Sequence, residues 1–155
     1  IGVRLVGSEM CIRDRGLGTA TPRAKLDVDG AVRFKSSSEN VEEVSSSSGE
    51  VTVDLSKGQT FNLNITENVT TFVVANPKSD STTFTIKMTQ PSGSTYSVGI
   101  DTFRNGSTGA AATCFWPGGV IPTVTQTAGR TDIYSFKTFD GCASFFGVVG
   151  GQGFA

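Results

Sequence analysis

The segment that decides the fold is residues 51–65, VTVDLSKGQTFNLNI. Apolar and polar residues alternate in it twice, first from Val51 to Leu55 and again from Phe61 to Ile65. A period of two is typical of a strand with one buried face, and the Ser-Lys-Gly break between the runs is typical of a turn. The segment therefore predicts two consecutive strands.

The same alternation recurs toward the C-terminus. Phe84, Ile86 and Met88 alternate with polar residues, and residues 133–139 place Tyr134 and Phe136 on one face. Such strands recur about every 8 to 12 residues, separated by short segments rich in Gly, Pro, Asn and Ser. No helical period of useful length is present. The pattern predicts an all-β fold, an antiparallel β-sandwich or jelly-roll-like domain over residues 51–155.

Two segments of different composition precede this domain. Residues 16–35, GLGTATPRAKLDVDGAVRFK, place Leu26 and Val28 before a turn at Asp29-Gly30 and resume the alternation after it. They predict a short connector hairpin, which is marginal in water without a partner. Residues 36–50, SSSENVEEVSSSSGE, hold little apolar surface and predict a Ser-rich linker.

Composition excludes several classes of function. The net charge of −1 gives no basic surface for nucleic acid, and no stretch approaches the roughly 18 apolar residues of a membrane span. The chain has no histidine, which removes histidine-dependent nucleophiles and histidine metal sites. We therefore expect no enzyme activity, no metal and no cofactor. Cys114 and Cys142 lie in apolar contexts that favour burial as small hydrophobic residues, and a disulfide between them stays open.

The most informative local feature is Trp116-Pro117-Gly118-Gly119, where the single tryptophan meets a Gly-rich bend. One interpretation makes Trp116 a ligand-binding residue that stacks on a sugar ring, with Arg104 and Asp101 donating or accepting hydrogen bonds. The other, which strand composition favours, packs Trp116 across the sandwich and lets Pro117 end the strand.

Carboxylates offer a second candidate chemistry. Asp101, Asp132 and Asp140 are available for a glycoside-cleaving pair, but nothing in their spacing requires one, and Asp140-Gly141 has the composition of a turn. No Asp-x-Asp-x-Asp series for calcium is present. We expect no catalytic residue and no metal ligand.

Residues 4–14, RLVGSEMCIRD, resemble the translation of a transposase-type sequencing adaptor. We therefore exclude residues 1–15 from the fold as an adaptor-derived artefact. The resemblance also implies that the natural N-terminus is missing.

Residues 16–22, GLGTATP, followed by residues 24–30, AKLDVDG, resemble the G-I-G-T-x-x-P-x-x-x-L-D-V-x-G element of bacteriophage tail fibres and related trimeric surface proteins. Leu17 replaces the usual isoleucine, and the chaperone domain that often follows this element is not recognisable. Three further segments are VDLSKGQTFNLNIT at 53–66, FWPGGVIPTVTQTAGRTDIYSF at 115–136 and GVVGGQGFA at 147–155. Through them, residues 51–155 also resemble C-terminal β-domains of marine phage structural proteins. The resemblance implies a virion location in the tail, a homotrimer, contacts with other virion proteins and attachment to host-surface glycan.

Three functions follow from these observations. The first is a tail-fibre or fibre-like virion component that supports attachment to a host surface. The second is a carbohydrate-binding or adhesin module of a cellular surface protein, which would place the chain outside the cell or on its surface. The third is a non-catalytic accessory domain of a glycan-cleaving enzyme. In all three the chain binds and does not catalyse.

Overall fold

The structure, a computed structural model, describes residues 15–155. The excluded residues 1–15 lie outside the described residues except for Arg15, whose backbone opens the first strand. The chain divides into two compact units, one ending at Ser38 and the other running from Glu39 to Ala155.

The first unit is a pair of short parallel strands, β1 (Arg15–Leu17) and β2 (Leu26–Val28). The N–H of Asp29 donates to the carbonyl oxygen of Leu17 at 2.9 Å and extends the pairing by one bond. The Asp27 carboxylate, in β2, accepts hydrogen bonds from Arg23 in the connection between the strands. The donors are the backbone N–H and the side chain of Arg23. None of the described side chains of this unit is buried.

The predicted hairpin around Asp29-Gly30 is therefore wrong. Residues 31–35 form no strand, and β2 pairs instead with the residues at the start of the motif. The alternation correctly marks β2 but not residues 31–35, and alternation does not specify which segment supplies the partner strand.

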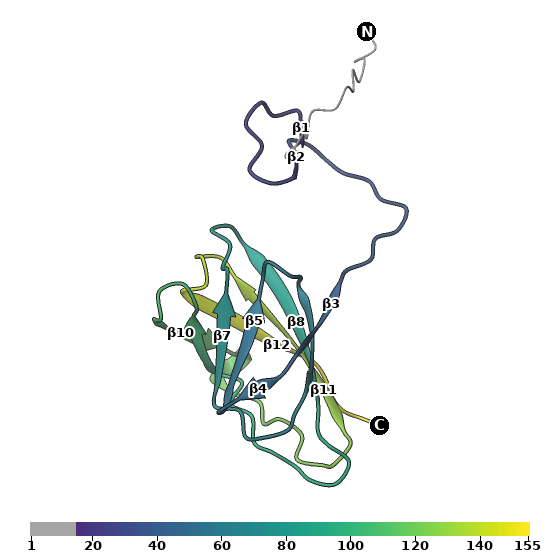
Figure 1. Cartoon of the computed structure of the whole chain (residues 1–155), viewed down its shortest axis with the longest axis vertical. Helices are drawn as coiled ribbons and strands as arrows, with labels where there is room; N and C mark the ends of the chain where they lie inside the picture. Colours follow the sequence, from purple (N-terminus) through teal and green to yellow (C-terminus); the bar gives the residue numbers. More distant parts are fainter. Residues whose placement is uncertain (1–14) are drawn as a thin grey trace. The chain divides into compact units, whose positions relative to one another are not determined.

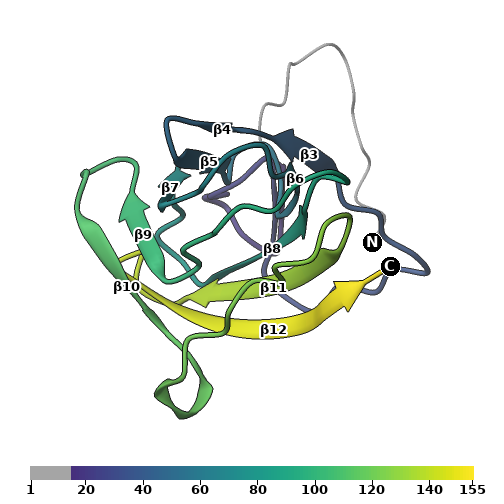
Figure 2. The same ribbon diagram turned by 90° about the horizontal axis from the view of Figure 1, so that it is seen from below.

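The second unit is a ten-stranded sheet wrapped around one core (Figures 1 and 2). In space the strands follow the order β3-β6-β8-β11-β12-β10-β9-β7-β5-β4. The two ends of this order, β3 and β4, are consecutive in the chain, so the sheet almost closes on itself. A single turn of 3-10 helix, η1 (Pro117–Gly119), follows β10. The strands are β3 (Val41–Val44), β4 (Ser46–Ser47), β5 (Glu50–Asp54), β6 (Thr60–Asn64), β7 (Thr71–Ala75), β8 (Thr82–Thr89), β9 (Thr102–Asn105), β10 (Ala111–Phe115), β11 (Thr131–Thr138) and β12 (Ser144–Phe154).

The all-β prediction is confirmed, but the sheet is mixed and not antiparallel throughout. Five of its nine pairings are parallel and four are antiparallel. From β5 to β9 the chain alternates between the two halves of the sheet, so that β5, β7 and β9 lie side by side and β6 lies beside β8. The crossovers from β5 to β7, from β6 to β8 and from β7 to β9 are thus each made by a strand of the opposite half, where other folds use a helix.

The predicted linker of residues 36–50 is also largely wrong, because residues from Glu39 onward belong to the second unit. Strand β3 pairs with β6, and β4 pairs with β5 through a two-residue turn. Ser48 and Gly49 both have positive φ, of 56° and 79°, as this hairpin turn requires. Strands at the edge of a sheet need little apolar surface, and here Val44 alone of β3 packs against the core.

The core is rich in phenylalanine. Six of the 11 phenylalanines are buried within it, and Phe103 lies at its centre with ring centroids 4.9 Å from Phe136 and 4.8 Å from Phe145. The alternation of the sequence predicts this core correctly, because Val51, Val53 and their counterparts in the other strands all point inward. The full set of buried hydrophobic residues is Val51, Val53, Leu55, Phe61, Leu63, Ile65, Val69, Phe72, Val74, Phe84, Ile86, Met88, Ile100, Phe103, Ala112, Trp116, Val124, Tyr134, Phe136, Cys142 and Phe145.

Candidate binding surface

Trp116 is a core residue, as strand composition favours. Its side chain is 7% exposed. Its ring makes T-shaped contacts with the rings of Tyr134 and Phe136, at centroid distances of 6.1 and 5.8 Å. Gly147 of the neighbouring strand β12 makes room for the ring, because a Cβ at this position would lie 2.6 Å from the nearest ring carbon. The indole therefore packs on Gly147 of β12 and against two aromatic rings of β11, and its Nε1 has no hydrogen-bond partner among residues 15–155.

Arg104 and Asp101 do not join Trp116 in one site. Arg104 lies in β9 between the buried residues Phe103 and Asn105, so its side chain points away from the core, where it pairs with Glu50. Asp101 precedes β9 and lies close enough to Cys114 to affect its ionisation. Burial, with the Asp101 charge adding to it, raises the pKa of the Cys114 thiol to about 12.

The two cysteines do not form a disulfide with each other. Cys114 is partly buried and Cys142 is fully buried, and both are free thiols. Burial, followed by the nearby Asp140 charge, also raises the pKa of Cys142. Both residues act as small hydrophobic side chains.

Asp132 has a structural role. It is 1% exposed, and its carboxylate accepts hydrogen bonds from the backbone N–H groups of Thr125 and Gly153 at 2.7 and 2.8 Å and from the Tyr134 hydroxyl at 3.1 Å. Burial alone would raise the pKa of Asp132, but these backbone donors outweigh it and lower the pKa. The carboxylate thereby ties the connection after η1 to the C-terminal end of β12.

Asp140 stabilises the turn between β11 and β12. Its carboxylate accepts hydrogen bonds from the Ser144 hydroxyl at 2.6 Å and from the backbone N–H groups of Ala143 and Ser144. Asp132 and Asp140 sit at opposite ends of β11, and a strand of that length separates them by about 20 Å. A glycoside-cleaving pair needs its carboxylates within about 10 Å. No cluster of metal-binding side chains occurs among residues 15–155.

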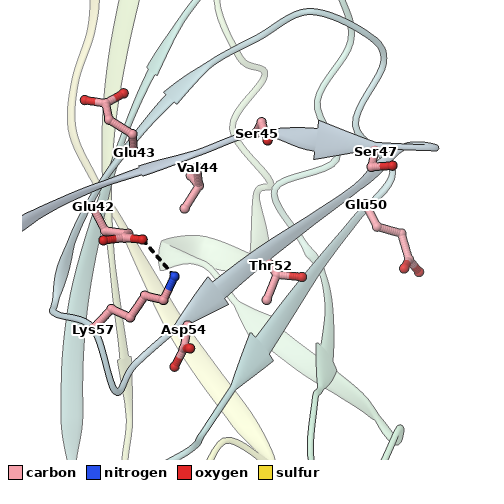
Figure 3. A pocket seen from close by; sticks show the side chains of 9 residues that line it. All are labelled: Glu42, Glu43, Val44, Ser45, Ser47, Glu50, Thr52, Asp54 and Lys57. Atoms are coloured by element: carbon pink, nitrogen blue, oxygen red, sulfur yellow. Dashed lines mark hydrogen bonds and ion pairs between the residues drawn. The ribbon is translucent and has the colours of Figure 1, made fainter.

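An acidic pocket of about 470 Å³ lies where the sheet almost closes, between β3, β4 and β5 (Figure 3). Its four carboxylates already have partners within the described chain. Glu42 pairs with Lys57 at 3.0 Å, and the others bond to neighbouring polar side chains. Those bonds join Glu43 to Asn62, Glu50 to Arg104, and Asp54 to Ser56 and Asn76. These contacts stabilise the edge strands of the sheet. Each of the four carboxylates of the pocket is therefore already paired or hydrogen-bonded within the described chain.

The outer surface of β10 and β12 carries a group of exposed aromatic rings, which we call the aromatic face and define as Phe115, Phe139, Phe146 and Val148. Phe115 and Phe146 are opposite each other in register and stack at 5.4 Å, and Phe139 meets Phe146 edge-on at 5.8 Å. Phe115 is 51% exposed, Phe146 is 45% exposed and Phe139 is 60% exposed. The ammonium group of Lys137 lies 4.9 Å from the centre of the Phe139 ring.

A hollow of about 340 Å³ opens beside the aromatic face, where β10 ends and the chain turns away from β12. Phe115, Phe146 and Val148 line it together with Trp116, Pro117 and Gly147. The chain then projects from the sheet (Figure 2) and exposes Val120 and Ile121, which are 72% and 52% accessible. An apolar depression and an apolar projection thus follow each other in the chain.

The sequence contains a signal for the aromatic face that our prediction did not use. Phe115-Trp116 and Phe145-Phe146 are pairs of adjacent aromatic residues inside strand-like segments. Because neighbouring side chains of a strand point to opposite faces, one member of each pair must point outward. Trp116 and Phe145 take the inward positions, so Phe115 and Phe146 are exposed.

Comparison with protein-family models, with curated proteins and with solved structures found no match to this chain. Among the described residues, no helix has the length and apolar character needed to cross a membrane.

Proposed function

We propose that the chain is a non-catalytic virion component of tail-fibre type, present as a homotrimer, that supports attachment to host-surface glycan. The observation that carries the proposal is the first unit, whose described part has a strand pair and no buried side chain among residues 16–38. Such an element belongs to an assembly in which other chains cover it.

The first unit exposes apolar side chains that an assembly of several copies would bury. Its large apolar side chains Leu17, Leu26, Val32 and Phe34 are 52%, 56%, 49% and 68% exposed. Isolated pairs of strands are marginal in water, and β1 and β2 have three residues each. Three copies placed around one axis would bring these apolar side chains together, and their burial would stabilise the unit by about 25 cal/mol for each Å² removed from water.

The non-catalytic part of the proposal is supported by the carboxylates. Asp132 and Asp140 are engaged in structural hydrogen bonds and lie far apart, and the chain has no histidine to act as a base. Exposed loops with hydroxyl groups, such as residues 92–95 and 106–109, offer hydrogen bonds to sugar hydroxyls without an acid or base within the loop. In a trimer, three weak sites of this kind would bind with increased avidity.

The proposal is tested by adsorption of the fluorescently labelled full chain to a panel of bacterial cells, before and after periodate oxidation of their surface glycans. We expect saturable adsorption to susceptible cells, its loss after oxidation, and no release of reducing sugar. Leu26→Ser should weaken adsorption through loss of avidity. Val41→Ser is the matched control, because Val41 is 54% exposed and Leu26 is 56% exposed. Absence of adsorption to every member of the panel, or release of reducing sugar, would contradict the proposal.

A further inference from the structure

We infer that the aromatic face of the second unit, with the adjacent Val120-Ile121 projection, is a contact surface between copies of this chain. The inference rests on the proposed function, because it assigns the surface by which the β-domains of a multi-copy fibre meet. It is independent of the first unit, since every residue involved lies in β10, β11, β12 or the turns between them.

The area of the surface favours another protein chain as its partner. An aromatic side chain carries roughly 150–250 Å² of surface, so the three partly exposed rings together present about 300 Å². Val148, Val120 and Ile121, at 55%, 72% and 52% exposure, bring the apolar area to roughly 600 Å². This value is at the upper end of the apolar patches found on monomers, and it supplies most of the approximately 800 Å² that each partner contributes to a standard interface.

The chemistry of the surface favours a second copy over a glycan. Phenylalanine and the aliphatic side chains have no group that hydrogen-bonds a hydroxyl, whereas sugar sites combine apolar contacts with convergent polar groups. The aromatic face contains no carboxylate, and Lys137, beside it, is already placed over the Phe139 ring. Burial between copies would therefore desolvate no charged group of the aromatic face itself.

The shape of the surface is also suited to contact between identical chains. The hollow lined by Phe115, Pro117 and Val148 is large enough for one or two apolar side chains, and the projection presents Val120 and Ile121 directly after it in the sequence. In a ring of identical chains each contact is head-to-tail, so the projection of one copy can enter the hollow of the next. A closed ring of this kind buries the hollow and the projection of every copy.

The inference is tested by sedimentation velocity of the full chain over a concentration series, with Phe146→Ser and Phe139→Ser as variants. We expect each variant to weaken self-association by about tenfold or more, as for central aromatic residues of interfaces. Val41→Ser, an exposed apolar position on β3, is the matched control and should leave self-association unchanged. Near-ultraviolet circular dichroism of Trp116 and its neighbours checks that the variants are folded. Phe139 follows the end of β11, so Phe139→Ser tests the surface even if Phe146→Ser fails to fold.

The possible outcomes separate this inference from the proposed function. If both Phe variants assemble like the wild type while Leu26→Ser does not, copies meet through the first unit alone, and the inference is wrong while the proposed function stands. If the variants lose assembly and the wild type adsorbs to no cell, the inference stands and the proposed function fails. A wild type that stays monomeric at every concentration overturns the inference whatever the adsorption result. Loss of glycan adsorption by variants whose assembly is unchanged would assign the face to a ligand and overturn it too.

Discussion

The packing of Trp116 against Gly147 gives a sharp test of how the β-domain is held together. Gly147→Ala adds a Cβ that would lie 2.6, 2.7 and 2.8 Å from three carbons of the indole ring, whereas ordinary carbon contacts are about 3.5–4.0 Å. The ring must therefore move by roughly 1 Å. Tyr134 and Phe136, whose rings pack in T-shaped contacts with the indole, limit that movement.

The expected cost follows from this geometry. Overpacking of a well-packed core costs about 1–3 kcal/mol. The lower entropy of an unfolded chain with alanine in place of glycine offsets about 0.4–1 kcal/mol of this. Because Gly147 does not have positive φ, no backbone strain is added. We predict a net loss of about 1–2 kcal/mol in the free energy of unfolding.

The assay is urea denaturation followed by far-ultraviolet circular dichroism. Gly93→Ala is the control, since Gly93 also lacks positive φ and has no neighbouring atom within 4 Å of an added Cβ, and it should change stability by less than about 0.5 kcal/mol. Trp116→Phe combined with Gly147→Ala should cost less than the sum of the two single changes, because the smaller ring relieves the clash. Equal stability of Gly147→Ala and wild type would refute the proposed packing of the indole.

Two further predictions concern buried groups. Because folding lowers the pKa of Asp132, its contribution to stability should be fully present above the unfolded value of about 3.9 and be lost as the pH falls through the folded pKa. Asp132→Asn should therefore lower the free energy of unfolding near neutral pH by about 1.5–3 kcal/mol. It should also reduce the loss of stability at acid pH. Urea titrations at several pH values measure both effects, and a pH profile equal to that of the wild type would contradict the prediction. Cys114 and Cys142 should resist iodoacetamide at pH 8 in the folded protein and react after unfolding, because burial raises the pKa of both thiols. Peptide mass spectrometry measures the alkylation of each cysteine. Rapid alkylation of either cysteine in the folded protein would contradict the prediction.

Alternation in the sequence predicts which residues form the core, but it does not predict how strands pair. Tyr134 and Phe136 are buried as expected, and so are the apolar residues of residues 51–65. A strand about every ten residues fits both an antiparallel meander and the alternating crossovers found from β5 to β9. Their difference lies in contacts between residues distant in the sequence, which local pattern does not contain.

The errors near the N-terminus have a related cause. Residues 39–47 are poor in apolar residues because β3 and β4 are the edge strands of the sheet, where one edge of each strand remains open. Composition alone cannot separate such an edge strand from a linker. In residues 16–35 the Asp-Gly pair suggested a hairpin, but the hydrogen-bonding partner of β2 lies before it in the chain.

The candidate site shows the same division between local and long-range information. Composition singled out Trp116, whose buried position against Gly147 and Tyr134 depends on the register of β10 with β12. The exposed rings of Phe115 and Phe146 could have been inferred from the adjacent aromatic pairs. Their stacking could not, because it arises from the parallel pairing of two strands about 30 residues apart.

Amide hydrogen exchange at several protein concentrations tests whether copies of the chain complete its first unit. The N–H of Asp29, which donates to Leu17, reports on the β1–β2 pair, and the N–H of Leu55, which donates to Ala75, is the internal reference in the β-domain. If copies assemble through the first unit, protection of the Asp29 amide rises with protein concentration. Protection of the Leu55 amide stays constant. Protection of Asp29 that is independent of concentration, whether high or negligible throughout, would contradict this prediction.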